Sequence, residues 1–541
     1  MPTMTYSRND FFKLLGTSLS EEQLSLLLCR VKAELETFGD NIVVKFNDTN
    51  LPWIWSVEGL VCVLKGLLGL EKGLPLVSVK SGSKNIIAEK ISGRPFIAGF
   101  CAAGVVSENL LIQLVQLQEK FCDAYGRKRS KIAVGIYSAE KISFPVRYSF
   151  FDGSTKFVAL NGTLMGLSEI LEKHPKGKEY AHIVHGWKKF PLLVDNQNNV
   201  LSFPPIINSE HSGRVVPGIS SLFFEATGTD EQGVMLACAI FAFALFQRGF
   251  ELESVVTIYP DKQIVAPDFT PRSVQLDMGL VESVLGLGLS EPSVKGLLEK
   301  LRYDSSKMVV PAMRHDIMHS VDVVEDVAIA YGYENITPEK LALYTKGATS
   351  NEQYFGDDVR LFLAGCGFQE VFSPYLTSKK LLFDMMNCAA SPLVEIDQFY
   401  SESYSVVRNS ILPVLLEFLA GNKHVDYPQR VFEEGLVCVR SPEIVDYRNV
   451  AFVSAHSTAS LTEMRQVLDF LFKSIGMTYS VEELANDSCI PGRCGSVFVK
   501  NHRIGFFGEL HPKVLENFKL DVPVSVAELN ISLLHELSNS R

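Results

Sequence analysis

No single hydrophobic core can organise a chain of 541 residues. Cores stop growing at roughly 250–300 residues, and longer chains divide into domains of about 50–200 residues. Three or four domains are therefore expected. Hydrophobic residues make up 47% of the chain and charged residues 21%, which excludes intrinsic disorder. The positive mean hydropathy also favours contact with a partner subunit.

Targeting and membrane segments are not evident. The longest apolar run, residues 234–246, is too short to span a bilayer and predicts a buried helix. Residues 1–15 include Arg8 and Lys13 and lack the apolar segment of a signal peptide. We therefore expect a cytoplasmic protein without a membrane segment. Its ten cysteines contain no Cys-x-x-Cys pair, and Cys489 and Cys494 are the closest two, so reduced thiols are expected.

The net charge of −11 argues against a protein that binds nucleic acid by its overall charge. An RNA contact would need a local basic patch. The densest candidate is Arg127-Lys128-Arg129 with Lys131. A solvated turn explains the same run equally well.

The order of predicted elements indicates a multidomain α+β fold. Residues 1–85 read as a small α/β unit, with helical spacing over residues 10–35 and a strand at 42–46. A mixed α/β domain is predicted over 86–267, and a compact, mainly helical one over 268–345. Residues 346–541 alternate helices with strands, a pattern typical of an antiparallel sheet with flanking helices.

Four carboxylates form the sharpest local signal. Asp322, Glu325 and Asp326 have the spacing of one helix face, and Asp316 lies just upstream. Oxygen donors without a soft ligand suit a hard cation, magnesium before calcium. The alternative is that these acids interact with the helix dipole and are solvated.

A second signal is the Pro204-Pro205 bend, which Ser202 and Asn208 flank with hydrogen-bonding side chains. Arg214 and Glu225 follow it. Such a corner suits a ligand pocket, although a structural turn fits the spacing better. No Gly-x-Ser-x-Gly elbow is present, so no nucleophilic serine is predicted. Neither nucleotide-binding glycine motif occurs.

Nine short stretches together resemble the β subunit of phenylalanyl-tRNA synthetase, in that family's order over nearly the whole chain. They are DTN (48–50), WSVEGL (55–60), GRKR (126–129), HPKGKEY (174–180), FPPIINS (203–209), TGTD (227–230), DVAIAYGY (326–333), RVFE (430–433) and GELHP (508–512). The chain departs from the family at Leu51, Trp53 and Ser320. The extra domains of the bacterial type have no counterpart, so the resemblance is to the archaeal/eukaryotic type.

The resemblance implies a role for each domain. Residues 86–267 would be an editing domain that hydrolyses tyrosine misattached to the phenylalanine tRNA. The helical domain would bind magnesium through Asp316, Asp322, Glu325 and Asp326. Residues 346–541 would be a class II synthetase-like domain that has lost its own reaction. The implied editing pocket has Glu225 as acceptor for the tyrosine hydroxyl, Leu193 lining the ring, and Ser202, Asn208 and Arg214 orienting the ester, water or terminal adenosine.

The loss of aminoacylation also has support in the sequence. Arg430 and Glu433 resemble a remnant of the class II motif that grips ATP, and no glycine-rich, arginine-ending partner motif follows. Aminoacylation and ATP binding are therefore expected on another chain, which the resemblance implies is an α subunit in an α2β2 assembly that binds tRNA(Phe). Two alternatives stay open: a free-standing trans-editing hydrolase, and a scaffold whose pocket has decayed.

Overall fold

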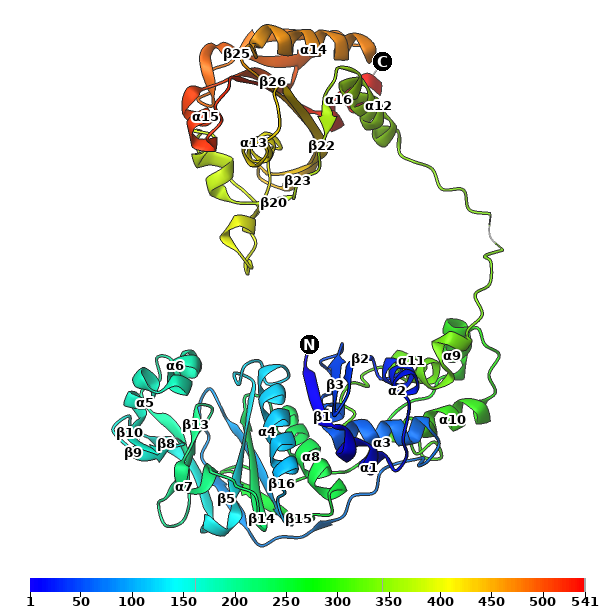
Figure 1. The fold of residues 1–541 in the computed structure, drawn as a ribbon, viewed down its shortest axis with the longest axis vertical. Coiled ribbons are helices and arrows are strands. Elements are labelled where there is room, and N and C mark those ends of the chain that lie inside the picture. Colours follow the sequence, from blue (N-terminus) through cyan, green and yellow to red (C-terminus); the bar gives the residue numbers. More distant parts are fainter. Residues whose placement is uncertain (161, 343, 540–541) are drawn as a thin grey trace. The chain divides into compact units, whose positions relative to one another are not determined.

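The computed structural model describes residues 1–160, 162–342 and 344–539. It contains two compact units, Met1–Lys340 and Leu341–Arg541, each of which mixes helices and sheets (Figure 1). The expectation of a multidomain α/β protein is thus confirmed at this level. The finer division of residues 1–345 into three domains stays a prediction.

The first unit begins with a three-stranded antiparallel sheet in the order β1-β3-β2. Its elements are β1 (Thr3–Ser7), α1 (Arg8–Leu15), α2 (Glu21–Cys29), β2 (Ala33–Phe38), β3 (Asn41–Phe46) and α3 (Val57–Leu67). The helical reading of residues 10–35 is wrong as a continuous element. Gly16 ends α1 in the left-handed conformation at φ 77°, and Ala33 already belongs to a strand.

An eleven-stranded sheet forms the centre of this unit, with the path β13-β12-β11-β8-β5-β15-β6-β14-β7. The strands on the path are β5 (Asn85–Ala88), β6 (Phe96–Ala103), β7 (Ile132–Ser138), β8 (Val146–Phe151), β11 (Phe190–Val194), β12 (Val200–Phe203), β13 (Ile207–Asn208), β14 (Ser221–Gly228) and β15 (Glu251–Ile258). Strands β4 (Val79–Lys80) and β16 (Gln263–Ala266) pair with β15. A separate hairpin consists of β9 (Lys156–Ala159) and β10 (Thr163–Gly166).

Helices α4 (Glu108–Asp123) and α8 (Glu231–Gln247) pack on one face of this sheet (Figure 1). Helix α8 is buried over almost its whole length, which confirms the prediction for residues 234–246. Because strand side chains alternate, Phe224 packs against Phe241 of α8 with ring centroids 4.6 Å apart. Phe223 belongs to a second core cluster on the opposite face. Glu225, two residues further along β14, shares that opposite face.

The rest of the first unit is mainly helical. Short helices α5 (Leu167–Lys173), α6 (Pro175–Tyr180) and α7 (Glu210–Gly213) lie within the sheet domain, and α9 (Met278–Leu285), α10 (Glu291–Lys300) and α11 (Ser320–Tyr331) follow it. Strands β17 (Arg272–Ser273) and β18 (Val309–Val310) pair with each other. One hydrophobic cluster contains residues from β1, α3, α8 and α11, so these parts share a core.

The second unit is a seven-stranded sheet in the order β19-β22-β23-β27-β26-β25-β24. It is antiparallel except where β19 (Gln369–Glu370) joins β22 (Gln429–Arg440). The other strands are β23 (Ile444–Ala455), β24 (Ser480–Glu483), β25 (Cys489–Val499), β26 (His502–Leu510) and β27 (Val524–Asn530). The short pair β20 (Leu376–Thr377) and β21 (Val406–Val407) stands apart from it. The helices are α12 (Asn351–Gly365), α13 (Leu412–Gly421), α14 (Leu461–Ser474), α15 (Pro512–Phe518) and α16 (Ile531–Asn539).

Alternating residues of this sheet enter two different cores. Val431 belongs to one cluster and Phe432 to the other, and Val453 and Phe452 divide in the same way. Both faces are therefore covered, as the strand period of two requires. Throughout the described ranges, no helix combines the length and the apolar character that crossing a bilayer requires.

Candidate functional site

A cavity of about 480 Å³ lies in the first unit where the two ends of the large sheet meet. Strands β7 and β14 at one end and β12 and β13 at the other supply its walls, and α4 contributes Leu111 and Val115. The Tyr137 hydroxyl on β7 lies 3.3 Å from Asn208 Oδ1 on β13, so the sheet curls until its edges touch. The volume lies in the range typical of pockets for small molecules.

Four of the five predicted pocket residues line this cavity: Ser202, Asn208, Arg214 and Glu225. Leu193 does not belong to the lining. It is fully buried in the core beside Tyr137 and Phe223, and it faces Ser202 across the β11–β12 ladder. Its predicted contact with the substrate ring stays a prediction. Arg214 is two-thirds exposed at the rim and pairs with Glu210 at 2.7 Å.

Glu225 is the most unusual group in the cavity. The Tyr137 hydroxyl donates a hydrogen bond to Glu225 Oε1 at 2.9 Å. The second oxygen, Oε2, is buried and has no hydrogen-bond partner among the described residues. A buried carboxylate oxygen without a donor is costly, so this atom is a ready acceptor for a ligand hydroxyl.

Burial raises the pKa of Glu225 from its ordinary 4.5 to about 7, although the Tyr137 hydrogen bond and the Arg94 charge both act to lower it. Gly135 makes this arrangement possible. It lies directly opposite Glu225 in the β7–β14 ladder. A Cβ at this position would be 2.2 Å from the Tyr137 hydroxyl oxygen and 2.6 Å from Glu225 Oε1.

His174 supplies a second unpartnered polar atom. Its Nδ1 accepts the Lys176 backbone N–H at 3.1 Å, which assigns the ring proton to Nε2. Nε2 is buried without a partner among the described residues, and the ring lines the cavity. Burial and the nearby Lys176 lower the pKa of His174, so the imidazole is neutral at pH 7. A neutral N–H donor therefore belongs to the same cavity as the Glu225 acceptor.

One residue of the predicted basic patch, Arg129, lines this cavity, whereas Lys131 pairs with Asp230. Arg127, Lys128 and Arg129 all have positive φ, and the buried Arg94 holds the turn by donating to the Arg129 carbonyl at 3.0 Å. Arg129 lines the cavity and donates to the Ile206 carbonyl at 2.9 Å. Arg127 and Lys128 are exposed. The cavity thus combines an acidic acceptor inside with cations close by.

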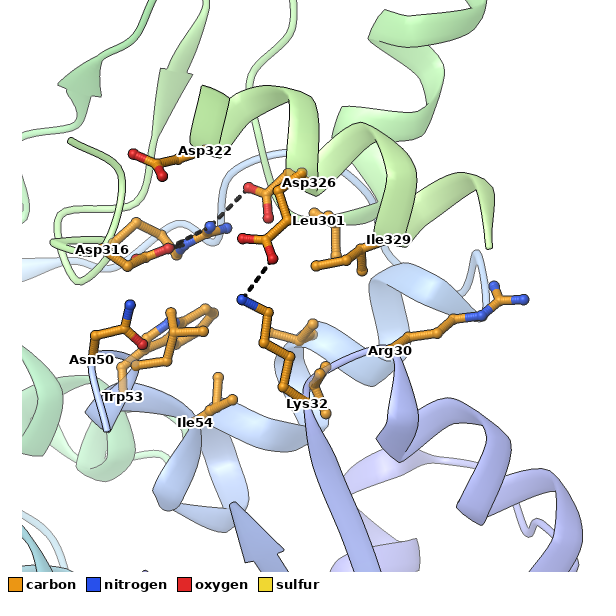
Figure 2. Close-up of a pocket in the computed structure, with 15 residues that line it drawn as sticks. Arg30, Lys32, Asn50, Trp53, Ile54, Leu301, Asp316, Asp322, Asp326 and Ile329 are labelled. Carbon is orange, nitrogen blue, oxygen red and sulfur yellow. Dashed lines mark hydrogen bonds and ion pairs between the residues drawn. The ribbon is translucent and has the colours of Figure 1, made fainter. Parts of the chain in front are cut away.

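The four predicted metal ligands line a second, smaller cavity of about 70 Å³ (Figure 2). Asp322, Glu325 and Asp326 come from α11, as their spacing predicts. Asp316 precedes that helix. Figure 2 shows Asp322 at the start of the helix, away from Asp326, and Lys32 reaching toward the cluster from the α2–β2 turn.

Cations of the chain itself already engage these carboxylates. Arg314 Nη2 lies 2.7 Å from one oxygen each of Asp316 and Asp326, and Lys32 lies 2.9 Å from Glu325. Asp322 accepts the backbone N–H groups of Met318 and His319 at 2.7 Å each. Within the described ranges, no three His, Cys, Asp or Glu side chains converge in a way that could hold a metal ion. The donor type therefore suits magnesium, whereas the arrangement does not form a ready site for it.

Arg430 and Glu433, the residues predicted to be a remnant of the class II motif, also have partners within the second unit. Arg430 pairs with Glu463 at 2.8 Å. Glu433 is buried and pairs with Arg408, which is completely buried, at 2.7 Å. Both charges therefore have partners inside their own unit.

Comparison with known proteins decides the family. The chain is 39% identical to the phenylalanine–tRNA ligase β subunit of Pyrococcus horikoshii, over 99% of this chain and all of that protein. It is 37% identical to the β subunit of Archaeoglobus fulgidus, over 98% of both chains. The chain belongs to the phenylalanine–tRNA ligase β-subunit family.

Domain-level matches agree with this assignment. The tRNA synthetase B5 domain matches residues 274–333, and the phenylalanyl tRNA synthetase beta chain CLM domain matches residues 338–531. The solved N-terminal fragment of the Pyrococcus horikoshii β subunit aligns with a TM-score of 0.59 and 38% identity. It covers 61% of this β-subunit chain and all of the fragment.

Three residues in or beside the cavity were not anticipated from the sequence. His174 lines the cavity and lies in a stretch that resembles the family, whereas Tyr137 and Gly135 act through their contacts with Glu225. A signal existed for these two, because Gly135 and Tyr137 are two residues apart and therefore share one face of a strand. Their pairing with Glu225, almost ninety residues later, required the sheet register.

Proposed function

We propose that this chain is the β subunit of a phenylalanine–tRNA ligase, and that the cavity around Glu225 hydrolyses tyrosyl-tRNA(Phe). The observation that carries the editing proposal is the buried, unpartnered Oε2 of Glu225 in a cavity of about 480 Å³. A tyrosine side chain brings the hydroxyl that this oxygen lacks. Phenylalanine would leave the same oxygen without a donor.

The need for editing follows from the synthetic reaction. An apolar pocket for phenylalanine rejects an added hydroxyl by only about a hundredfold. A pocket with a buried acceptor selects tyrosine over phenylalanine instead. Phenylalanine leaves the acceptor without a hydrogen bond, which costs roughly 1–3 kcal/mol of binding free energy. Tyr137 orients this acceptor by holding Oε1, which directs hydroxyl recognition to Oε2.

Hydrolysis requires little additional chemistry because an aminoacyl ester is already activated. Water attacks the ester carbonyl carbon, the bond to the ribose oxygen breaks, and a proton passes to that oxygen. The His174 Nε2–H group is positioned as a donor to the polarised ester or ribose oxygen. Asn208 and Arg214 orient the ester and the terminal adenosine. Positioning of this kind supplies several kcal/mol of the barrier reduction without a covalent intermediate.

The test is deacylation by the complex of this chain with its partner subunit, measured with tyrosyl- and phenylalanyl-tRNA(Phe). We expect tyrosine to be released at least about tenfold faster than phenylalanine. The tyrosine rate should rise as pH increases through about 7, because the carboxylate form of Glu225 is the better acceptor. Equal rates for the two esters would refute hydroxyl selection in this cavity.

Aminoacylation is proposed to take place on an α subunit that binds ATP, in a cytoplasmic α2β2 complex that recognises tRNA(Phe). The names of the relatives support this assignment. So do the ion pairs of Arg430 with Glu463 and of Glu433 with Arg408, which engage both residues within this chain. Purification from the native cells should yield a second chain. If the chain purified alone and still hydrolysed mischarged tRNA, a free-standing trans-editing hydrolase would replace the α2β2 proposal.

Magnesium is proposed to bind the α11 carboxylates only when Lys32 leaves Glu325, because the ammonium and the metal compete for the same charge. Asp316, Asp322, Glu325 and Asp326 would then contribute oxygen ligands. We expect Lys32→Met to tighten magnesium binding to the full-length chain about threefold to tenfold in calorimetry, and Lys45→Met to leave it unchanged. Unaltered affinity in Lys32→Met would contradict the competition.

A further inference from the structure

Two buried cysteines face the same glycine at the β25–β26 ladder of the second unit. Cys489 pairs with Leu510 and Cys494 with Gly508, while four residues bulge out between the two cysteines. A Cβ built on Gly508 would lie 3.0 Å from the Cys489 sulfur and 3.2 Å from the Cys494 sulfur. The missing side chain at Gly508 therefore leaves the space that both sulfur atoms occupy.

The backbone spacing suits a bond between these cysteines. Their partners Gly508 and Leu510 are two residues apart on a strand, which corresponds to roughly 6.8 Å. Disulfides join Cα atoms that are usually about 4.4–6.8 Å apart, so only a small approach of the bulge is required. The bulge contains Gly492 with φ 75°, and residues 491–493 are exposed.

The two thiols also interact directly. A hydrogen bond from the Cys489 thiol lowers the pKa of Cys494, and the positive charge of Arg503 acts in the same direction against burial. The same hydrogen bond and burial raise the pKa of Cys489. Because the positive charge of Arg503 acts on Cys494 and not on Cys489, we assign Cys494 as the attacking thiol and Cys489 as the second thiol. Cys101 differs, because its sulfur interacts with Lys84 and burial raises its pKa.

We propose that Cys489 and Cys494 form a redox-active dithiol that closes to an intrachain disulfide. With a small disulfide such as oxidised glutathione, the Cys494 thiolate attacks one sulfur and releases one glutathione thiolate. The Cys489 thiol then loses its proton to solvent, attacks the Cys494 sulfur of the mixed disulfide and releases the second glutathione. The protein dithiol loses two protons and two electrons, and one glutathione disulfide takes them up to become two thiols. This inference does not depend on the editing proposal.

The experiment equilibrates the full-length chain anaerobically in glutathione buffers that range from fully reducing to strongly oxidising. Free thiols are alkylated after an acid quench, and peptides are analysed by mass spectrometry. We expect the peptide that carries both cysteines to lose two hydrogens and escape alkylation in oxidising buffers, and to regain both labels after reduction. Cys62 and Cys238 are buried controls that should stay alkylatable in unfolded samples from every buffer.

Two variants separate the pair from general oxidation. Cys489→Ser should convert the product into a mixed disulfide of Cys494 with glutathione, and Cys494→Ser should leave Cys489 largely unmodified. A wild-type peptide that remains doubly alkylated in all buffers would overturn the proposal. So would a wild type that forms only mixed disulfides, or one in which Cys489 pairs with a different cysteine.

Discussion

Replacing Glu225 with alanine is expected to slow hydrolysis of tyrosyl-tRNA(Phe) by about tenfold to a hundredfold. The substitution removes a hydrogen bond between a charged acceptor and the tyrosine hydroxyl, which is worth roughly 1.5–3 kcal/mol. Each 1.4 kcal/mol corresponds to about a factor of ten in rate. The measurement is single-turnover deacylation by the assembled complex. Phenylalanyl-tRNA(Phe) should be hydrolysed at the same slow rate by both proteins.

Two matched variants show whether the charge or the shape matters. Glu225→Gln keeps the volume and one acceptor oxygen, so its loss should be smaller than that of Glu225→Ala. The Tyr137 hydroxyl donates to Oε1 and thereby lowers the Glu225 pKa. Tyr137→Phe removes this donor and should raise the Glu225 pKa, so the rise in the rate of tyrosyl-tRNA hydrolysis should move to higher pH. A Glu225→Ala complex that clears tyrosyl-tRNA at the wild-type rate would refute the assignment.

Stability measurements distinguish loss of recognition from loss of folding. The folded-state pKa of Glu225 is about 7, above its ordinary 4.5, so the folded protein holds this proton more tightly than the unfolded chain does. The contribution of Glu225 to the free energy of unfolding therefore declines as pH rises from about 4.5 through 7. Glu225→Gln has no proton to lose and should become more stable than wild type above pH 7, by up to about 3 kcal/mol.

Replacing Arg408 with alanine is expected to destabilise the second unit by about 3–5 kcal/mol. Arg408 is completely buried, and its guanidinium pairs with buried Glu433 at 2.7 Å and donates to the Leu436 carbonyl at 2.9 Å. Removing it leaves the Glu433 charge uncompensated in the core. For a unit of this size, the melting temperature should fall by roughly 10 °C. Calorimetry of the full-length chain measures the shift, and hydrogen exchange in β22 assigns it to this unit.

The control for Arg408 is Arg465, whose exposed pair with Asp469 at 3.4 Å should contribute about 0–1 kcal/mol. Arg465→Ala should therefore leave the transition almost unchanged. The double variant Arg408→Met with Glu433→Gln should recover part of the loss, because it removes both buried charges. Equal effects of the Arg408 and Arg465 substitutions would show that the buried pair is not the cause.

Local sequence patterns were sufficient to predict features that lie within a single helix. The apolar run at residues 234–246 became the buried helix α8 because its residues are hydrophobic on every side. The spacing of Asp322, Glu325 and Asp326 placed them on one helix, α11. Helical spacing failed at residues 10–35, where Gly16 and the pairing of β2 with β3 interrupt it.

The carboxylate cluster shows where residue spacing stops being informative. Spacing identified four oxygen donors, but it could not show that Arg314 joins Asp316 to Asp326 or that Lys32, nearly three hundred residues earlier, reaches Glu325. These ion pairs decide whether a metal finds open ligands. They depend on the packing of the α2–β2 turn against α11, which is a long-range contact.

Local order along the chain was enough to predict the buried helix and the carboxylate helix, and the family resemblance pointed to four of the residues that line the cavity. The environment of those residues depends on contacts between distant segments, which appear only in the folded chain. Curling of the large sheet brings β7 to β13, and the register of the β7–β14 ladder sets Tyr137 beside Glu225. Burial there leaves one carboxylate oxygen without a donor and raises its pKa to about 7, since desolvation depends on everything packed around it.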